Sequence, residues 1–192
     1  VVMASPARHS ATLVESLSKD AAAQLAMREH ASVVMIALTV PRSMWPQHLT
    51  GSGYLVPKPE QTAITAVSFA SNKWAHVQTD DNSMVLRVSL GRDGMPMHHL
   101  DDETLLKLAL ADLYWHLGID LVPTEVRITR WVESFPQYRP GHFAEVDRLE
   151  HILDVSAPGV VFAGASYRGI GIPSCIADAN RAAARVLAKI DA

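Results

Sequence analysis

A glycine-rich turn near the end of the chain has residue types that suggest binding chemistry. Residues 163–173 read Ala-Gly-Ala-Ser-Tyr-Arg-Gly-Ile-Gly-Ile-Pro; a short apolar run precedes them, and a helix is expected from about 174 to 190. Glycine lets the backbone approach a ligand closely, and the free N–H groups at a helix N-terminus favour negative charge. This pattern alone leaves two interpretations open: contact with a phosphate or an electron-rich ring, or tight packing.

Other reactive residue types are present, but their spacing is not typical of a catalytic or metal site. No two histidines are four residues apart and only His98 and His99 are adjacent, so we predict no metal site. No Gly-x-Ser-x-Gly elbow precedes a helix. Cys175 would lie near a helix N-terminus, where the dipole lowers a thiol pKa, but the apolar Ile172 and Ile176 beside it favour a buried packing role.

Composition and charge restrict the class of protein. With 192 residues, 48% of them apolar, the chain can form one folded domain and part of a second. A net charge of -3 gives no basic surface for a phosphate backbone, so we expect no nucleic-acid partner. The single cysteine excludes a disulfide framework and favours a cytoplasmic setting. The longest apolar run, 31–40, covers about half of the ~20 residues that a membrane span needs, and it predicts a buried strand.

The elements that would position the glycine-rich turn form a mixed α/β (α+β) pattern. Helical spacing predicts one or two helices over 8–29, and a helix over 100–118 that Asp101 caps and Gly118 ends. One stripe of that second helix should carry Leu106, Leu110, Leu113 and Leu117. Further helices are predicted at 141–153 and 174–190. The predicted strands are 1–4, 32–40, 53–56, 63–69, 84–90, 124–132 and 159–163, with those from 51 to 90 antiparallel.

Seven strings in the chain together resemble one family. They are residues 1–6, 51–57 (Gly-Ser-Gly-Tyr-Leu-Val-Pro), 71–74 (Ser-Asn-Lys-Trp), 86–91, 130–138, 141–142 and 164–176. Their order and spacing resemble the C-terminal part of the flavin-dependent protoporphyrinogen and coproporphyrinogen oxidases, a branch of the flavin amine-oxidase superfamily. The likeness covers nearly the whole chain.

The resemblance implies an FAD-dependent oxidoreductase of haem (porphyrin) biosynthesis. Its substrate would be coproporphyrinogen III, oxidised to coproporphyrin III, or protoporphyrinogen IX, oxidised to protoporphyrin IX, with electrons passing to FAD and then to oxygen. The strings at 71–74 and 171–176 resemble the Gram-positive branch, which favours coproporphyrinogen III. The alternatives are a non-enzymatic tetrapyrrole-binding domain and a flavin amine oxidase. The expected location is cytoplasmic, with peripheral contact with a membrane left open.

The resemblance also assigns site residues. The positions that match flavin contacts of the family are Trp131, Ile170, Gly171 and Ile172. Gly53 and Leu55 match the substrate-domain strand that walls the porphyrinogen cavity. We assign no catalytic side chain, because removal of a hydride is the chemistry of the flavin.

The family's domain plan implies three segments: 1–30 as the end of an FAD-domain segment with connecting helices, 31–123 as the substrate-binding domain, and 124–192 as the return to the FAD domain. No Gly-x-Gly-x-x-Gly opens a βαβ unit here, and that fingerprint belongs to the family's N-terminal half. We therefore expect a fragment of a longer flavoprotein that is inactive alone and binds FAD weakly or not at all. Its exposed apolar edges would favour self-association or partial disorder.

Overall fold

The computed structural model describes residues 1–78 and 82–190, and it confirms the mixed α/β class predicted from the sequence. The chain forms two compact units. Unit 1 consists of Val1–His30 and Pro136–Ala192, and unit 2 consists of Ala31–Phe135. Residues 124–135 therefore group with unit 2, although the expected domain plan placed them with the last segment. The assignment of the segments to an FAD domain and a substrate domain stays a prediction.

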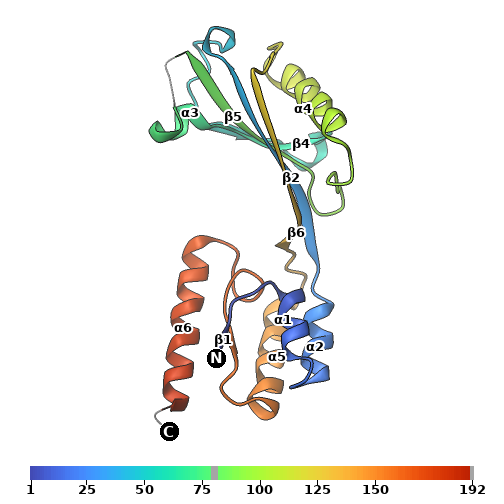
Figure 1. The fold of residues 1–192 in the computed structure, drawn as a ribbon, viewed down its shortest axis with the longest axis vertical. Helices are drawn as coiled ribbons and strands as arrows, with labels where there is room; N and C mark the ends of the chain where they lie inside the picture. The colour runs from blue at the N-terminus through green and yellow to red at the C-terminus, as the bar shows by residue number, and fades with distance from the viewer. Residues whose placement is uncertain (79–81, 191–192) are drawn as a thin grey trace. The chain divides into compact units, whose positions relative to one another are not determined.

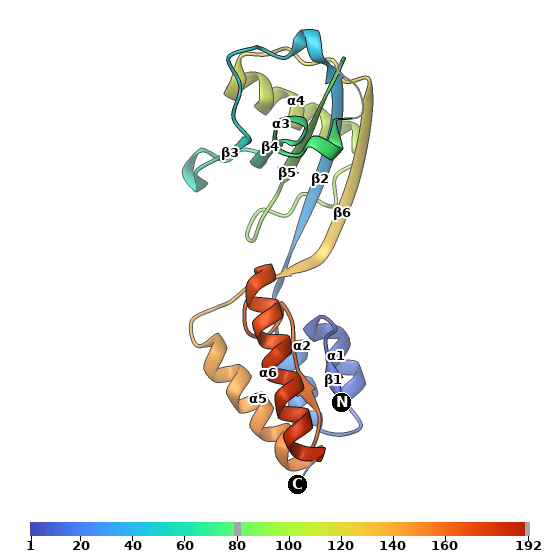
Figure 2. The ribbon, with the colours of Figure 1, turned by 90° about the vertical axis from the view of Figure 1, so that its left-hand side faces the viewer.

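Unit 2 is built on a five-stranded sheet with the order β3-β4-β5-β2-β6 (Figure 2). The strands are β2 (His30–Pro41), β3 (Gly53–Leu55), β4 (Ile64–Phe69), β5 (Ser83–Leu90) and β6 (Glu125–Pro136). Neighbouring strands from β3 to β2 pair antiparallel, which confirms the prediction for the three strands between 51 and 90. Along β5 the side chains of Met84, Leu86 and Val88 are buried and alternate with more exposed ones. Because successive side chains of a strand point to opposite faces, one face of the sheet forms the core of unit 2.

Helix α4 (Asp102–Leu117) covers that face, as Figure 1 shows. The Asp101 carboxylate accepts the Thr104 N–H at 2.8 Å, and Gly118 ends the helix with φ 68°, so both predicted ends are confirmed. The prediction of which α4 residues form the buried stripe was wrong in part, because the helix buries Leu105, Ala109 and Leu113. Three of the four predicted stripe residues, Leu106, Leu110 and Leu117, are only partly buried.

Short elements complete unit 2. They are α3 (Ala70–Lys73) and the 3-10 turns η1 (Arg42–Met44), η2 (Lys58–Glu60) and η3 (Ala75–Val77). Within the described residues, no helix of the chain is long and apolar enough to cross a membrane.

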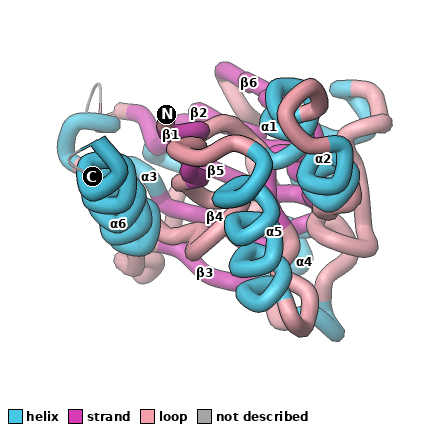
Figure 3. Tube along the Cα trace, turned by 90° about the horizontal axis from the view of Figure 1, so that it is seen from below, coloured by secondary structure: helices cyan, strands magenta, loops and turns pink. Residues whose placement is uncertain are grey.

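Unit 1 pairs two short parallel strands, β1 (Val2–Met3) and β7 (Val161–Phe162), and packs helices around them. The helices are α1 (Ala7–Val14), α2 (Lys19–Ala26), α5 (His142–Ser156) and α6 (Ile172–Ile190). The predicted stretch 8–29 thus forms two helices, and α5 lies beside α2 (Figure 3). Phe162 and Tyr167 are fully buried in the core between α1, α2 and α5. This core supports the glycine-rich turn that joins β7 to α6.

Candidate functional site

The turn between β7 and α6 is held at both ends by hydrogen bonds. The Gly164 N–H donates to the buried carboxylate of Asp178 at 3.0 Å. The Tyr138 hydroxyl accepts the Gly169 N–H at 2.7 Å and donates to the Ala165 carbonyl, also at 2.7 Å. Burial raises the pKa of Tyr138, so the phenol stays protonated and can donate. One side chain thus fixes the turn at two points.

His142, at the start of α5, positions Tyr138. The two rings stack with centroids 3.6 Å apart. The imidazole Nε2 is 2.7 Å from the Tyr167 carbonyl, and Nδ1 is 3.0 Å from the Arg28 guanidinium. Since a guanidinium only donates, Nδ1 must accept and Nε2 carries the proton. Burial lowers the pKa of His142, and the positive charge of Arg28 acts in the same direction. The imidazole is therefore neutral.

The buried side of the turn is anchored to the N-terminal part of the chain. The Tyr167 ring stacks on Phe162 with centroids 4.7 Å apart, and its hydroxyl donates to Ser10 Oγ at 2.8 Å. Burial raises the pKa of Tyr167 to about 12. Ser166 Oγ accepts the Ala7 N–H at 3.2 Å. These contacts leave the opposite side of the turn, residues 170–172, exposed.

The exposed side of the turn presents backbone and apolar surface. Gly169 has φ +131°, and a Cβ there would lie 2.4 Å from Ser174 Cβ, so glycine is required. A Cβ on Gly171 would meet nothing closer than Pro173 Cδ at 3.9 Å, which leaves the backbone open to a ligand. Helix α6 starts at Ile172; Pro173 has no N–H and the Cys175 N–H donates to the Gly171 carbonyl, so the donors left at this end of the helix are the N–H groups of Ile172 and Ser174. The turn thus fits a flat, electron-rich ring that accepts hydrogen bonds.

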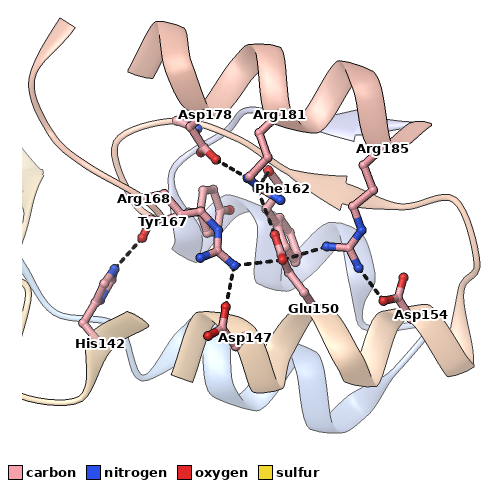
Figure 4. Close-up of polar contacts among 11 residues, drawn as sticks. His142, Asp147, Glu150, Asp154, Phe162, Tyr167, Arg168, Asp178, Arg181 and Arg185 are labelled. Atoms are coloured by element: carbon pink, nitrogen blue, oxygen red, sulfur yellow. Dashed lines mark hydrogen bonds and ion pairs between the residues drawn. The ribbon is translucent and has the colours of Figure 1, made fainter. Parts of the chain in front are cut away.

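A buried cluster of charges joins α5 to the turn and to α6 (Figure 4). The Glu150 side chain is 8% exposed and accepts from Arg168, Arg181 and Arg185 at 2.9, 2.9 and 2.7 Å. Arg181 also pairs with Asp178 at 2.9 Å, the carboxylate that holds Gly164. Because Arg168 comes from the turn and Arg181 and Arg185 from the middle of α6, this cluster ties both the turn and the middle of α6 to α5.

A second candidate site lies at the edge strand of unit 2. A cavity of about 620 Å³ is lined by β3 and by the end of α4, including Trp115 and His116. Leu55 and Trp115 are 81% and 85% exposed. The Tyr54 hydroxyl is 3.0 Å from His116 Nδ1, and burial raises the pKa of Tyr54. Gly53 cannot be replaced, since a Cβ would lie 2.2 Å from the Val67 carbonyl oxygen.

The sequence-predicted site residues lie in both units. Ile170, Gly171 and Ile172 share the exposed side of one turn in unit 1. Gly53 and Leu55 share β3 in unit 2, where Trp131 is half-exposed on β6. Cys175 is half-buried and its thiol donates to the Gly169 carbonyl at 3.3 Å.

Sequence reasoning missed the residues that position the turn. The strings at 136–138 and 141–142 contain Tyr138 and His142, but nothing in their spacing predicts that the two rings stack. The sequence did not predict that Asp178 would be buried and hold the turn, because an aspartate inside a helix usually faces solvent.

The chain is similar to known flavoproteins. Residues 1–187 match the family described as flavin containing amine oxidoreductase. A coproporphyrinogen III oxidase of Mycobacterium tuberculosis (strain ATCC 25618 / H37Rv) is 36% identical over 193 residues, covering 100% of this chain and 41% of the relative. A coproporphyrinogen III oxidase of Bacillus subtilis (strain 168) is 32% identical over 184 residues, covering 95% of this chain and 38% of the relative.

A solved structure from Exiguobacterium sp. 255-15, provisionally named a protoporphyrinogen oxidase, has a TM-score of 0.81 at 27% identity and covers 98% of this chain and 41% of that one. The chain therefore spans about two fifths of the length of these relatives. Because the family match takes in almost every residue, the chain belongs to the flavin containing amine oxidoreductase family.

Proposed function

We propose that this chain is the flavin- and substrate-facing part of an FAD-dependent porphyrinogen oxidase of haem biosynthesis. The observation that carries the proposal is the turn between β7 and α6, which exposes backbone at 170–172 on a hydrogen-bonded support. Coproporphyrinogen III is the proposed substrate, because two relatives more than 30% identical to this chain carry that name. Oxygen is the proposed electron acceptor.

The turn would hold the flavin ring through its backbone. Ile170, Gly171 and Ile172 are the proposed contacts, with Trp131 as a further contact from β6. When bound, FAD supplies the two-electron oxidation. The amides at the start of α6 and the positive end of its dipole favour the negative charge that a flavin ring gains on reduction. Tyr138 and Asp178 hold the turn that leads to these amides, because they accept the N–H groups of Gly169 and Gly164.

The edge of the unit 2 sheet would hold the substrate. Gly53 and Leu55 are the proposed contacts, because a porphyrinogen is a broad apolar ring and the exposed Leu55 side chain offers apolar surface. The partners proposed for the whole protein are thus a porphyrinogen and oxygen. A cytoplasmic location, peripheral membrane contact and self-association stay predictions.

The test uses the full-length protein. We expect a stoichiometric flavin absorbance band and, with coproporphyrinogen III in air, growing porphyrin fluorescence with oxygen consumption. Gly171→Asp should strip the flavin, because a carboxylate would lie against the electron-rich ring. Ala111→Asp, on the exposed side of α4, is the matched control and should keep it. A wild-type protein that carries flavin but forms no porphyrin would overturn the proposed substrate.

A further inference from the structure

The face of the unit 2 sheet opposite α4 carries a second set of side chains. In β5, Met84, Leu86 and Val88 are buried in the core that includes α4, so Arg87 and Ser89 point to the opposite face. Figure 1 shows α4 along one face of the sheet. Among the described residues, the side chains on the other face are exposed or only half-buried.

The strand register places small residues on either side of Arg87. In one row across four strands, Gly53 pairs with Ser68, Ser68 with Arg87, and Arg87 with Ala37; the next row joins Leu55, Ala66, Ser89 and Met35. We call these eight residues the open face. The small side chains of Ser68, Ala37, Ala66 and Ser89 leave the surface around Arg87 flat. At the usual strand spacing, Arg87 lies about 10 Å from the strand that carries Leu55.

The same side of the sheet also carries, outside the eight residues of the open face, the aromatic residue proposed to contact the flavin. In β6, Val126 and Ile128 pack against the core, so Trp131 points to the side that carries Arg87. The proposed flavin contact and the proposed substrate contact Leu55 therefore share one face of the sheet with Arg87. Because β3 and β6 are the two edges of the five-stranded sheet, about 19 Å apart at the usual strand spacing, Arg87 on the central strand β5 lies between them.

Arg87 is the exposed charge at the centre of this face. Among the described residues it forms no ion pair with a carboxylate, and its guanidinium carbon lies 5.9 Å from the centroid of the Trp74 ring. The Lys73 ammonium lies 4.6 Å from the same ring. This end of the face is therefore positive and available to an anion.

We propose that Arg87 binds a propionate carboxylate of the porphyrinogen lying on the open face. This inference rests on the proposed function. The planar guanidinium matches a carboxylate in a two-point hydrogen-bonded pair, while the flat rows beside it accept the apolar ring. Arg87 is thus a substrate-binding residue that selects for tetrapyrroles with carboxylate side chains.

The experiment compares the full-length wild type with Arg87→Gln and Arg87→Lys. Lys107→Gln, an exposed cation on α4, is the matched control. KM and kcat for coproporphyrinogen III are measured from the rate at which porphyrin fluorescence grows. Separate titrations measure the Kd of the product coproporphyrin III and of its uncharged tetramethyl ester. Flavin content and circular dichroism confirm that each variant is folded.

We expect Arg87→Gln to raise KM and the Kd of coproporphyrin III at least about tenfold, the effect of losing a charge-assisted hydrogen bond, with a smaller change in kcat. The KM and Kd of Arg87→Lys should lie between those of wild type and Arg87→Gln. The tetramethyl ester should bind wild type and Arg87→Gln with the same Kd. The inference would be overturned if Arg87→Gln raised the Kd of coproporphyrin III and of its tetramethyl ester equally, or if its KM were unchanged. A wild type that binds coproporphyrin III through Arg87 but forms no porphyrin would refute the proposed function alone.

Discussion

The Tyr138 hydroxyl connects the two ends of the turn between β7 and α6, and Tyr138→Phe removes that connection alone. The hydroxyl accepts the Gly169 N–H and donates to the Ala165 carbonyl, each at 2.7 Å. The substitution keeps the aromatic ring and its stacking on His142, so packing is preserved. The change therefore isolates the contribution of the two hydrogen bonds to the turn.

The size of the effect follows from the two bonds. Each contributes about 1 kcal/mol net, so the free energy of unfolding should fall by about 2 kcal/mol. If FAD binds only the ordered turn, the same energy corresponds to an FAD Kd raised by up to about 30-fold. The proton-donating role also predicts that neither effect changes between pH 6 and 8, since burial raises the pKa of Tyr138.

The assay titrates full-length apoprotein with FAD and follows quenching of flavin fluorescence, alongside guanidinium unfolding. Tyr114→Phe is the control, because Tyr114 is exposed on α4 and forms no hydroxyl hydrogen bond among the described residues. A Tyr138→Phe protein that unfolds at the wild-type midpoint and binds FAD with the wild-type Kd would refute the idea that this hydroxyl holds the turn.

Two further predictions concern the groups around the turn. Glu150→Gln removes the carboxylate that three guanidinium groups share, but Asp147, Asp178 and Asp154 each still pair with one of them. We therefore expect the free energy of unfolding to fall by about 1–3 kcal/mol, the range for hydrogen bonds to charged groups, against almost none for the exposed Glu103→Gln. An unchanged midpoint would show that the cluster contributes nothing. Because burial lowers the pKa of His142, its contribution to stability is complete above the unfolded value of about 6.5 and is lost as the pH falls through the folded pKa. Unfolding midpoints measured from pH 8 to 5 should fall less in His142→Gln than in wild type, and parallel curves would contradict this.

The elements were predictable because their signals are local. Asp101 and Gly118 mark the ends of α4 through contacts within one helical turn, and both ends were found. The buried stripe of α4 was not predicted correctly, because leucines occupy several sides of this helix and periodicity cannot choose among them. The sheet made that choice by packing against Leu105, Ala109 and Leu113.

The candidate site, too, was predictable from the sequence only in part. The glycines of the turn stand out in the sequence, and Gly169 does fit where a Cβ would collide with Ser174. The support from Tyr138 does not stand out, since it joins residues 27 and 31 positions apart. Arg87 became a candidate only once the register placed it between Ser68 and Ala37.

The parallel pairing of β1 with β7 sets an order for folding during synthesis. Val2 pairs with Val161, so unit 1 needs two segments that lie far apart in the sequence, whereas unit 2 is the continuous segment Ala31–Phe135. A contact that closes so long a loop forms slowly and only after its second strand has left the ribosome. The sheet with Arg87 can therefore form while the ribosome still holds the strand that precedes the glycine-rich turn, and the turn is completed after the sheet.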